Sequence, residues 1–261
     1  GLRGQVLKEN VPAATQLLAD MMCKVGDVDA AKDIVAANLS GAKEFPEEVI
    51  LEHLHDAAYL DQPMGMPIQG TPESVASLTA DDVAAYMAAN VTAARTAVAG
   101  AGAVAPSFTL AAEEAFSKLP SLQGDLELAM EPAVFTGSDK RIRIDSMESG
   151  CHAALTFAGA SHSSSDAVEL LMIQALLGSF DQSSGVMAKN MTSKLAIDQG
   201  EQEAAKAFTV VNTSYKDSGL FGVYFQCPDN RAEDAMWYTL WNLVRLCHKT
   251  TDAEVSELLS K

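Results

Sequence analysis

The fold is decided by one stretch of the chain, residues 49–102, which reads VILEHLHDAAYLDQPMGMPIQGTPESVASLTADDVAAYMAANVTAARTAVAGAG. Its first apolar residues recur at helical spacing, and Pro46 with two following glutamates suits a first helical turn. We therefore predict a helix that ends near Tyr59. Residues 61–72 carry three prolines and two glycines, which is too much turn chemistry for a regular element, so the chain must turn there.

The second half of the stretch predicts a helix followed by a strand. Thr79 stands three residues before Asp82, and this capping pattern predicts a helix over residues 83–90. Residues 95–102 are mostly small, and we predict a strand against which another element packs closely. A helix, a sharp corner, a second helix and a strand thus follow one another within about fifty residues.

The flanking sequence alternates between predicted helices and strands. Helical periodicity predicts helices at residues 11–22, 27–37, 110–119 and 166–177, a long helix from Arg231 through Cys247, and a last helix capped by Thr251. Polar and apolar residues alternate at 140–145 and again at 151–157, and residues 207–215 and 220–227 flank a short turn, which predicts strands and a hairpin. Because helices and strands are interspersed, the class is α/β or α+β.

The periodicity is lost between residues 120 and 132, where acidic residues increase and a linker is expected. We predict an N-terminal domain at residues 1–122, a linker at 123–138 and a C-terminal domain at 139–261. Both halves share the order strand, helix, strands, helix, which is consistent with a two-fold internal repeat.

The net charge, the length of the apolar runs and the cysteine spacing argue against several classes of protein. With 18 basic and 35 acidic residues among 261, the net charge of −17 argues against nucleic acid or an anionic membrane as the main partner. No apolar run approaches the roughly 20 residues that span a bilayer. The four cysteines are far apart in sequence, so neither a zinc knuckle nor a C-x-x-C pair is indicated, and we expect reduced core thiols at Cys23, Cys151, Cys227 and Cys247.

Motifs for catalysis are weak or absent. None of the zinc-protease patterns H-x-x-x-H, H-E-x-x-H and H-x-x-E-H occurs, and a single E-x-x-H at Glu52 and His55 falls short of the two that a di-metal bundle needs. Residues 100–105 fit the G-x-G-x-x-[GA] turn of a dinucleotide site, but Pro106 interrupts the helix that this turn should open. Residues 178–185 lack the G-K-[ST] of a phosphate loop, and the Ser/His run at 161–165 is better explained as a helix cap by Ser164 or Ser165.

Several of these segments resemble the pitrilysin/insulinase-type (M16) metallopeptidases. The resemblance to the N-terminal domain of that family rests on LHDAAY (54–59), PMGMPIQGTPESV (63–75) and the segment 95–102. LGSFDQS (177–183), SKLA (193–196) and NTSYKDSGLFG (212–222) resemble the β branch of the family, which holds processing-peptidase β subunits and core subunits of the cytochrome bc1 complex. Nearly the whole chain is covered, and the resemblance implies an α+β fold of two similar peptidase-like domains, each with a mixed or antiparallel sheet covered by helices.

The same resemblance implies that the zinc ligands are missing. Active members carry H-x-x-E-H before the segment that matches the first residues here, and a distal glutamate in E-R-x-V-I-x-x-E. The corresponding stretch, residues 31–38, keeps the apolar pair but has Ala31 at the ligand position and Asn38 at the second carboxylate position. No glutamate lies between Gly26 and Lys43 to take over, so we expect no catalytic residue, no metal ligand and no cofactor.

The resemblance implies a non-catalytic scaffold subunit of the bc1 complex (respiratory complex III), on the matrix side of the mitochondrial inner membrane and peripheral to it. Its expected partners are a core 2-like or processing-peptidase α-like subunit and other complex III subunits. One alternative is a catalytic processing-peptidase β subunit, a zinc endopeptidase that cleaves presequences. Another is a nucleotide-dependent enzyme that uses residues 100–105.

Overall fold

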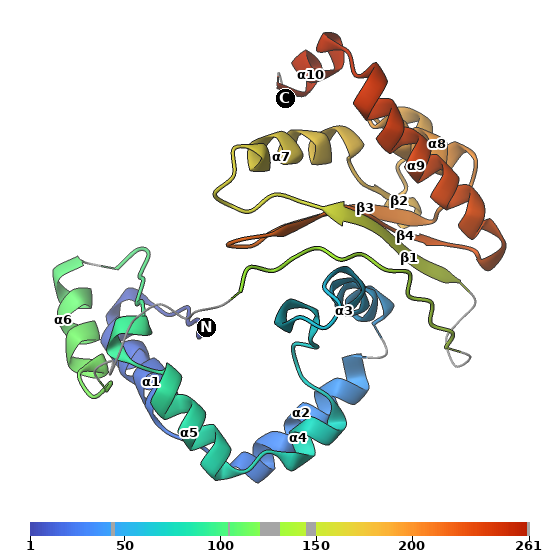
Figure 1. Cartoon of the computed structure of the whole chain (residues 1–261). Coiled ribbons are helices and arrows are strands. Elements are labelled where there is room, and N and C mark those ends of the chain that lie inside the picture. The colour runs from blue at the N-terminus through green and yellow to red at the C-terminus, as the bar shows by residue number, and fades with distance from the viewer. Residues whose placement is uncertain (43–44, 104, 121–130, 145–149, 260–261) are drawn as a thin grey trace. The chain divides into compact units, whose positions relative to one another are not determined.

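The computed structural model describes residues 1–42, 45–103, 105–120, 131–144 and 150–259 (Figure 1). The chain divides into two compact units. The first consists of Gly1–Ser40 and Gln69–Met130, and the second of Gly41–Ile68 and Glu131–Lys261. The predicted boundaries at 122, 123–138 and 139 stay a prediction, although the contacts group residues 41–68 with the C-terminal part of the chain.

In its described residues the first unit is helical. Its helices are α1 (Val11–Cys23), most of α2 (Val28–Ala42), α4 (Pro72–Ser77), α5 (Ala80–Asn90) and α6 (Ala105–Phe116), with 3-10 turns at Lys8–Asn10 and Ala93–Arg95. Helix α1 packs on α6, and Thr15, Ala19 and Ala115 are buried in this unit. Small side chains at such a contact allow two helices to approach closely.

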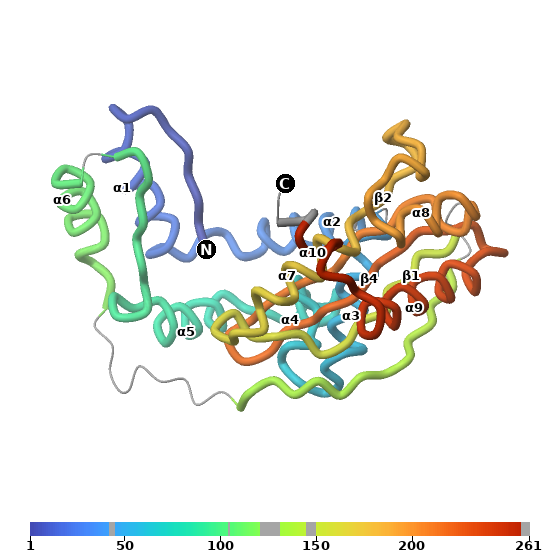
Figure 2. Tube along the Cα trace, turned by 90° about the horizontal axis from the view of Figure 1, so that it is seen from above, coloured from blue at the N-terminus to red at the C-terminus, as the bar shows by residue number. Residues whose placement is uncertain are grey.

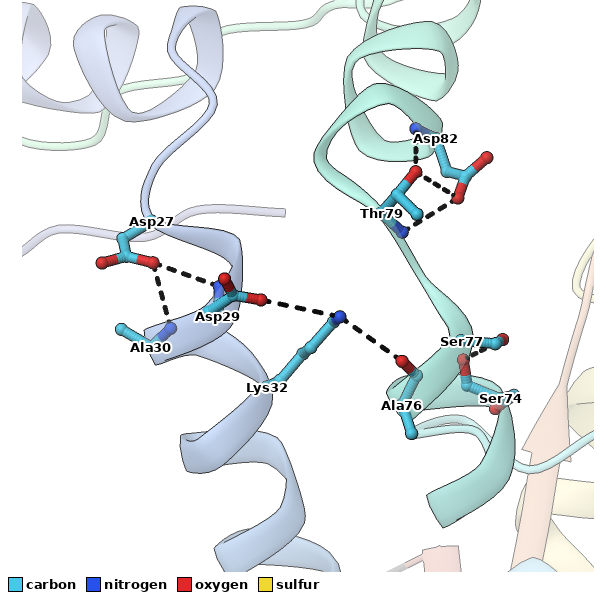
Figure 3. Close-up of polar contacts among 9 residues, drawn as sticks. All are labelled: Asp27, Asp29, Ala30, Lys32, Ser74, Ala76, Ser77, Thr79 and Asp82. Atoms are coloured by element: carbon cyan, nitrogen blue, oxygen red, sulfur yellow. Dashed lines mark hydrogen bonds and ion pairs between the residues drawn. The ribbon is translucent and has the colours of Figure 1, made fainter.

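Local side-chain bonds fix the starts of α2 and α5 in the first unit (Figure 3). The Asp27 carboxylate accepts the amide hydrogens of Asp29 and Ala30, each at 3.1 Å, and thereby caps α2. Thr79 and Asp82 form the predicted reciprocal capping box at the start of α5. These interactions lie within a few residues of each other, which is why the sequence alone could predict them.

The second unit is built on one four-stranded antiparallel sheet with the order β1-β4-β3-β2. Its strands are β1 (Cys151–Ala158), β2 (Phe180–Asp181), β3 (Ala207–Ser214) and β4 (Gly219–Cys227). Its helices are α3 (Pro46–Ala58), α7 (Asp166–Leu177), α8 (Lys194–Glu201), α9 (Ala232–Lys249) and α10 (Asp252–Leu259). The 3-10 turns of this unit lie at Pro63–Gly65, Gln182–Ser184, Ala188–Asn190 and Asp229–Arg231.

Strand β4 is buried on both faces and separates two cores. Phe221, Val223 and Phe225 point into the larger core, which α7, α8 and α9 cover, while Leu220 and Tyr224 point into the smaller core against α3 (Figure 1). Alternate residues of a strand point to opposite faces, so a nearly continuous apolar run is what a strand covered on both sides requires.

An extended segment, residues 131–144, runs beside α3 and completes the smaller core (Figure 2). The side chain of Gln62 donates to the Val134 carbonyl at 2.7 Å and accepts from the Val134 amide at 2.8 Å. Thr136 bonds to the carbonyl of Ala58, and Lys140 pairs with Asp56. This segment belongs to the second unit because side-chain bonds join it to the end of α3 and the turn that follows.

Two predicted strands are corrected. Residues 95–102 form the end of a 3-10 turn and then an irregular segment, and residues 140–144 are extended but belong to no strand of the described sheet. A strand needs a neighbour that accepts its backbone hydrogen bonds, and neither segment is among the four strands of the described sheet. The expected close packing of the first segment is nevertheless confirmed, since a Cβ placed on Gly100 would lie 2.8 Å from the Phe108 ring.

The fold class is confirmed as α+β, with the strands of the described residues gathered in a single sheet. The predicted helices are confirmed with small changes at their ends, and so is the β3–β4 hairpin. One change has a clear cause. Helix α6 begins at Ala105, earlier than predicted, because Pro106 lies in its first turn, where proline needs no amide hydrogen.

Candidate functional site: histidine–tyrosine pairs on the α3 side of the sheet

The two positions where the family resemblance expects carboxylates lie on α2. Ala31 and Asn38 are seven residues apart, two helical turns, and both are exposed. An alanine offers no donor atom and an asparagine offers a neutral amide, which suits zinc poorly. Among the residues that the structure describes, no group of three or more His, Cys, Asp and Glu side chains is placed to hold a metal ion.

The histidine of the single E-x-x-H motif has both ring nitrogens engaged. His55 Nδ1 lies 2.7 Å from the Leu51 carbonyl oxygen, and Nε2 lies 2.5 Å from the hydroxyl of Tyr215. A carbonyl can only accept, so Nδ1 carries the hydrogen and Nε2 accepts from the tyrosine. In this arrangement neither nitrogen is left for a metal, and no local pattern indicated that a residue 160 positions away was its partner.

Tyr215 and its neighbours fix the hairpin turn against α3. Tyr59 is fully buried, and its hydroxyl lies 3.2 Å from the Ser218 hydroxyl and 3.3 Å from the Gly219 carbonyl. His162 donates to the Tyr215 carbonyl from its backbone amide at 2.9 Å and from Nδ1 at 2.8 Å. Burial raises the pKa of Tyr215, so its hydroxyl stays protonated at neutral pH and continues to donate.

A second histidine–tyrosine pair lies between β1 and β4. His152 Nδ1 is 2.7 Å from the Tyr224 hydroxyl, and the two rings stack with centroids 6.1 Å apart. Burial lowers the pKa of His152 and raises the pKa of Tyr224, so both side chains are uncharged at neutral pH. His53 on α3 also has a lowered pKa, first because of burial and then because of Lys140. The site is a set of hydrogen-bonded histidine and tyrosine rings that joins α3, the hairpin and β1.

The four cysteines are all free, but only part of the prediction is confirmed. Cys227 is a buried core thiol and Cys151 is half-buried, whereas Cys23 and Cys247 are exposed and lie outside the core. The prediction was wrong for these two because their helices, α1 and α9, turn those positions toward solvent. The sequence also gave no sign that Cys151 pairs directly opposite Cys227 in the sheet.

The remaining sequence motifs form no site in the described residues. The glycine-rich segment at 100–103 follows no strand, and the Phe108 ring packs against Gly100, where a bound phosphate would need room. Ser164 accepts the amide hydrogen of Asp166 at 3.2 Å at the start of α7, which confirms the capping interpretation for Ser164; Ser165 makes no such bond.

Helix α9 carries an apolar stripe on the side that faces away from the core. The stripe consists of Trp237, Leu240, Trp241 and Val244, which follow the i, i+3, i+4, i+7 spacing of one helical face and are all exposed. The two indole rings stack with centroids 5.8 Å apart at an interplanar angle of 2°, and Lys249 Nζ lies 5.6 Å from the Trp241 ring centroid. Clustered aromatic surface of this kind is typical of sites where proteins bind one another.

The family model described as the M16 peptidase inactive domain matches residues 77–261, most of the chain. The chain therefore belongs to the M16 peptidase family, within which the matched domain is the inactive one. It is 33% identical over 258 residues to mitochondrial-processing peptidase subunit beta of Blastocladiella emersonii, covering 97% of this chain and 54% of that protein. It is 31% identical over 263 residues to the probable subunit beta of Arabidopsis thaliana, covering 97% of this chain and 48% of that protein.

A chain in the structure of complex III2 from Candida albicans with Inz-5 bound has the same fold. The TM-score is 0.85 at 24% sequence identity, over 97% of this chain and 61% of that chain. The chain spans about half the length of the curated relatives it matches. Within the residues that the structure describes, no helix is both long enough and apolar enough to cross a membrane.

Proposed function

We propose that the chain is a non-catalytic scaffold subunit of the cytochrome bc1 complex, respiratory complex III. The observation that carries this proposal is the pair Ala31 and Asn38, exposed on α2 where the family resemblance places a zinc ligand and a second carboxylate. A catalytic zinc needs three protein ligands, and the loss of one removes both metal affinity and the activated water. The protein then contributes surface and shape to an assembly.

Two further observations support an assembly role. The solved structure with the same fold carries the name of complex III, and the relatives named above carry mitochondrial names. The exposed stripe on α9 offers aromatic surface that a partner can cover. We place the chain on the matrix side of the inner membrane, paired with a core 2-like or processing-peptidase α-like subunit and in contact with other complex III subunits.

The two-domain organisation belongs to the same proposal. The second unit supplies a helix-covered sheet, and the matched family model, residues 77–261, includes the four strands of that sheet. The helices of the first unit are the counterpart of the helical part of an N-terminal M16-like domain, with residues 123–138 as the linker. The N-terminal domain would then contribute bulk and contacts in place of catalysis.

The decisive experiment is purification of the native, full-length protein from inner membranes through an affinity tag at its chromosomal locus. We expect it to elute with cytochromes b and c1 at equal stoichiometry, read from their reduced optical spectra, with zinc well below one atom per chain by elemental analysis. Elution without the cytochromes would contradict the proposal.

A second candidate is favoured by the relatives, because the two named above are β subunits of the processing peptidase. In that case the full-length protein would elute as a heterodimer with an α-like subunit, hold one zinc per chain and cleave a basic presequence peptide. The same preparation therefore distinguishes the two candidates. Zinc with presequence cleavage supports the peptidase, whereas cytochromes without zinc support the scaffold.

A further inference from the structure

Two thiols face each other at one end of the sheet. Cys151, the first residue of β1, is paired in register with Cys227, the last residue of β4. Residues directly opposite each other in an antiparallel pair point to the same face, with Cα atoms about 4.5 or 5.5 Å apart. Disulfides bridge Cα separations of about 4.4–6.8 Å. The register alone therefore places the two cysteines within bonding geometry without any movement of the backbone.

The two thiols differ in their access to solvent. Cys227 is fully buried in the larger core, whereas Cys151 is half-buried at the strand end. The residue before Cys151 is Gly150, so no side chain at that position covers the pair, and even a Cβ there would lie 3.6 Å from the Cys227 carbonyl oxygen. A small oxidant would reach Cys151 before Cys227.

The electrostatic surroundings give the same order of reaction. The pKa of Cys227 is raised to about 12, chiefly by burial and then by the charge of Cys151 and the hydrogen bond between the two thiols. The Cys227 thiol therefore stays protonated at neutral pH. The negative charge of Asp229 raises the pKa of Cys227 further, and the positive charge of Lys206 lowers it. Only a thiolate attacks a disulfide, so the protonated Cys227 reacts slowly with an oxidant in solution. It reacts once Cys151 carries a mixed disulfide, because that disulfide is then held next to Cys227.

We propose that Cys151 and Cys227 form a reversible cross-strand disulfide, with a low-molecular-weight disulfide such as oxidised glutathione as the oxidant. The Cys151 thiolate attacks one sulfur of oxidised glutathione, forms a mixed disulfide and releases one glutathione thiolate. Cys227 then gives up its proton to the released glutathione thiolate and attacks Sγ of Cys151. This forms the protein disulfide and releases the second glutathione as a thiolate, which takes a proton from solvent. Two protein thiols are oxidised and one oxidised glutathione is reduced to two thiols, so atoms and electrons balance.

The experiment uses the full chain with Cys23→Ser and Cys247→Ser, which removes the two exposed thiols and leaves the pair alone. After incubation with oxidised glutathione and alkylation, we expect mass spectrometry to show the loss of two hydrogens, no stable glutathione adduct and a crosslinked peptide that joins residues 151 and 227. Adding Cys227→Ser should trap one glutathione on Cys151. Adding Cys151→Ser should leave Cys227 unmodified.

Circular dichroism checks that each variant is folded, and urea shows that both thiols react once the sheet opens. A stable glutathione adduct on Cys151 in the protein that retains Cys227 would overturn the proposal, as would two thiols that stay free in the folded protein. Reaction of Cys227 before Cys151 would overturn it as well.

Discussion

At the scale of single residues, the two histidine–tyrosine pairs join segments that lie far apart in sequence. His55 is oriented by the Leu51 carbonyl and bonds to Tyr215, and His152 bonds to Tyr224 between two strands. The His55 bond stabilises the contact between α3 and the hairpin, and the His152 bond stabilises the contact between β1 and β4. A buried hydrogen-bonded pair contributes about 1 kcal/mol to the free energy of unfolding.

The lowered pKa of His152 predicts a dependence of stability on pH. Because the folded-state pKa lies below the ordinary value of 6.5, the unfolded chain takes up a proton first as the pH falls. The contribution of neutral His152 is therefore complete above pH 6.5 and is lost as the pH falls through and below that value. Urea unfolding at several pH values should show a free energy of unfolding that declines from pH 7.5 toward pH 5.5.

The control for this prediction is His152→Gln, which keeps a polar side chain but does not titrate. At pH 8 it should cost about 1 kcal/mol through the weakened bond to Tyr224, and its decline toward pH 5.5 should be shallower. A remaining slope is expected from His53, whose pKa is also lowered by burial. An unchanged slope in the variant would show that His152 does not contribute.

At the scale of elements, one carboxylate joins α10 to two other helices. Glu254 pairs with Lys194 Nζ of α8 at 2.6 Å and with Arg245 of α9 at 3.1 Å, and it accepts the Thr251 amide hydrogen at 3.0 Å. These partners, the Lys194 hydrogen bond first and then the Thr251 amide, lower the pKa of Glu254 to about 2. One side chain thus caps its own helix and joins it to two others.

Glu254→Gln should loosen α10 and leave the sheet intact, because it removes the charge from the cap and from both ion pairs. We expect hydrogen exchange of the α10 amides to accelerate several-fold, corresponding to about 1 kcal/mol of local stability. In the unchanged protein, protection of α10 should be complete above pH 4.5 and fall as the pH drops from there toward 2. Glu233→Gln, at an exposed position in the first turn of α9, is the control and should leave α10 unchanged.

Elements were predicted well wherever their cause is local. Thr79 with Asp82 marks a helix start within four residues, and the hairpin turn joins two strands that are close in sequence. The segments 95–102 and 140–144 have strand-like patterns but are not among the strands of the described sheet, because strand pairing depends on tertiary contacts that no local pattern contains. The His55–Tyr215 bond was missed for the same reason. The assignment of Ala31 and Asn38 to the family's carboxylate positions rests on a motif and stays a prediction.

At the scale of the whole molecule, the apolar stripe on α9 is the surface we expect a partner subunit to cover. Trp237→Ser together with Trp241→Ser should leave the unfolding midpoint nearly unchanged, since both side chains are exposed. The yield of cytochromes b and c1 recovered with the tagged protein should fall at least tenfold, because buried tryptophans commonly contribute 2 kcal/mol or more to an interface. Ile68→Ser removes an apolar side chain that is more exposed than either tryptophan and lies outside the stripe, so it should not reduce the yield. Full recovery with the double variant would show that the stripe faces no subunit of the complex.

Helix α3 and the hairpin that completes its core are separated by 160 residues, as the bond between His55 and Tyr215 shows. A ribosome adds about 5–20 residues per second, so on the order of ten seconds or more pass before β3 and β4 emerge behind α3. During that interval the nascent helix has no sheet to cover Leu54 and Tyr59, both of which end up buried. We therefore expect a chaperone to bind the exposed apolar face of α3 early in synthesis. We also expect α3 to dock on the sheet in a slow last step, once β3 and β4 are available.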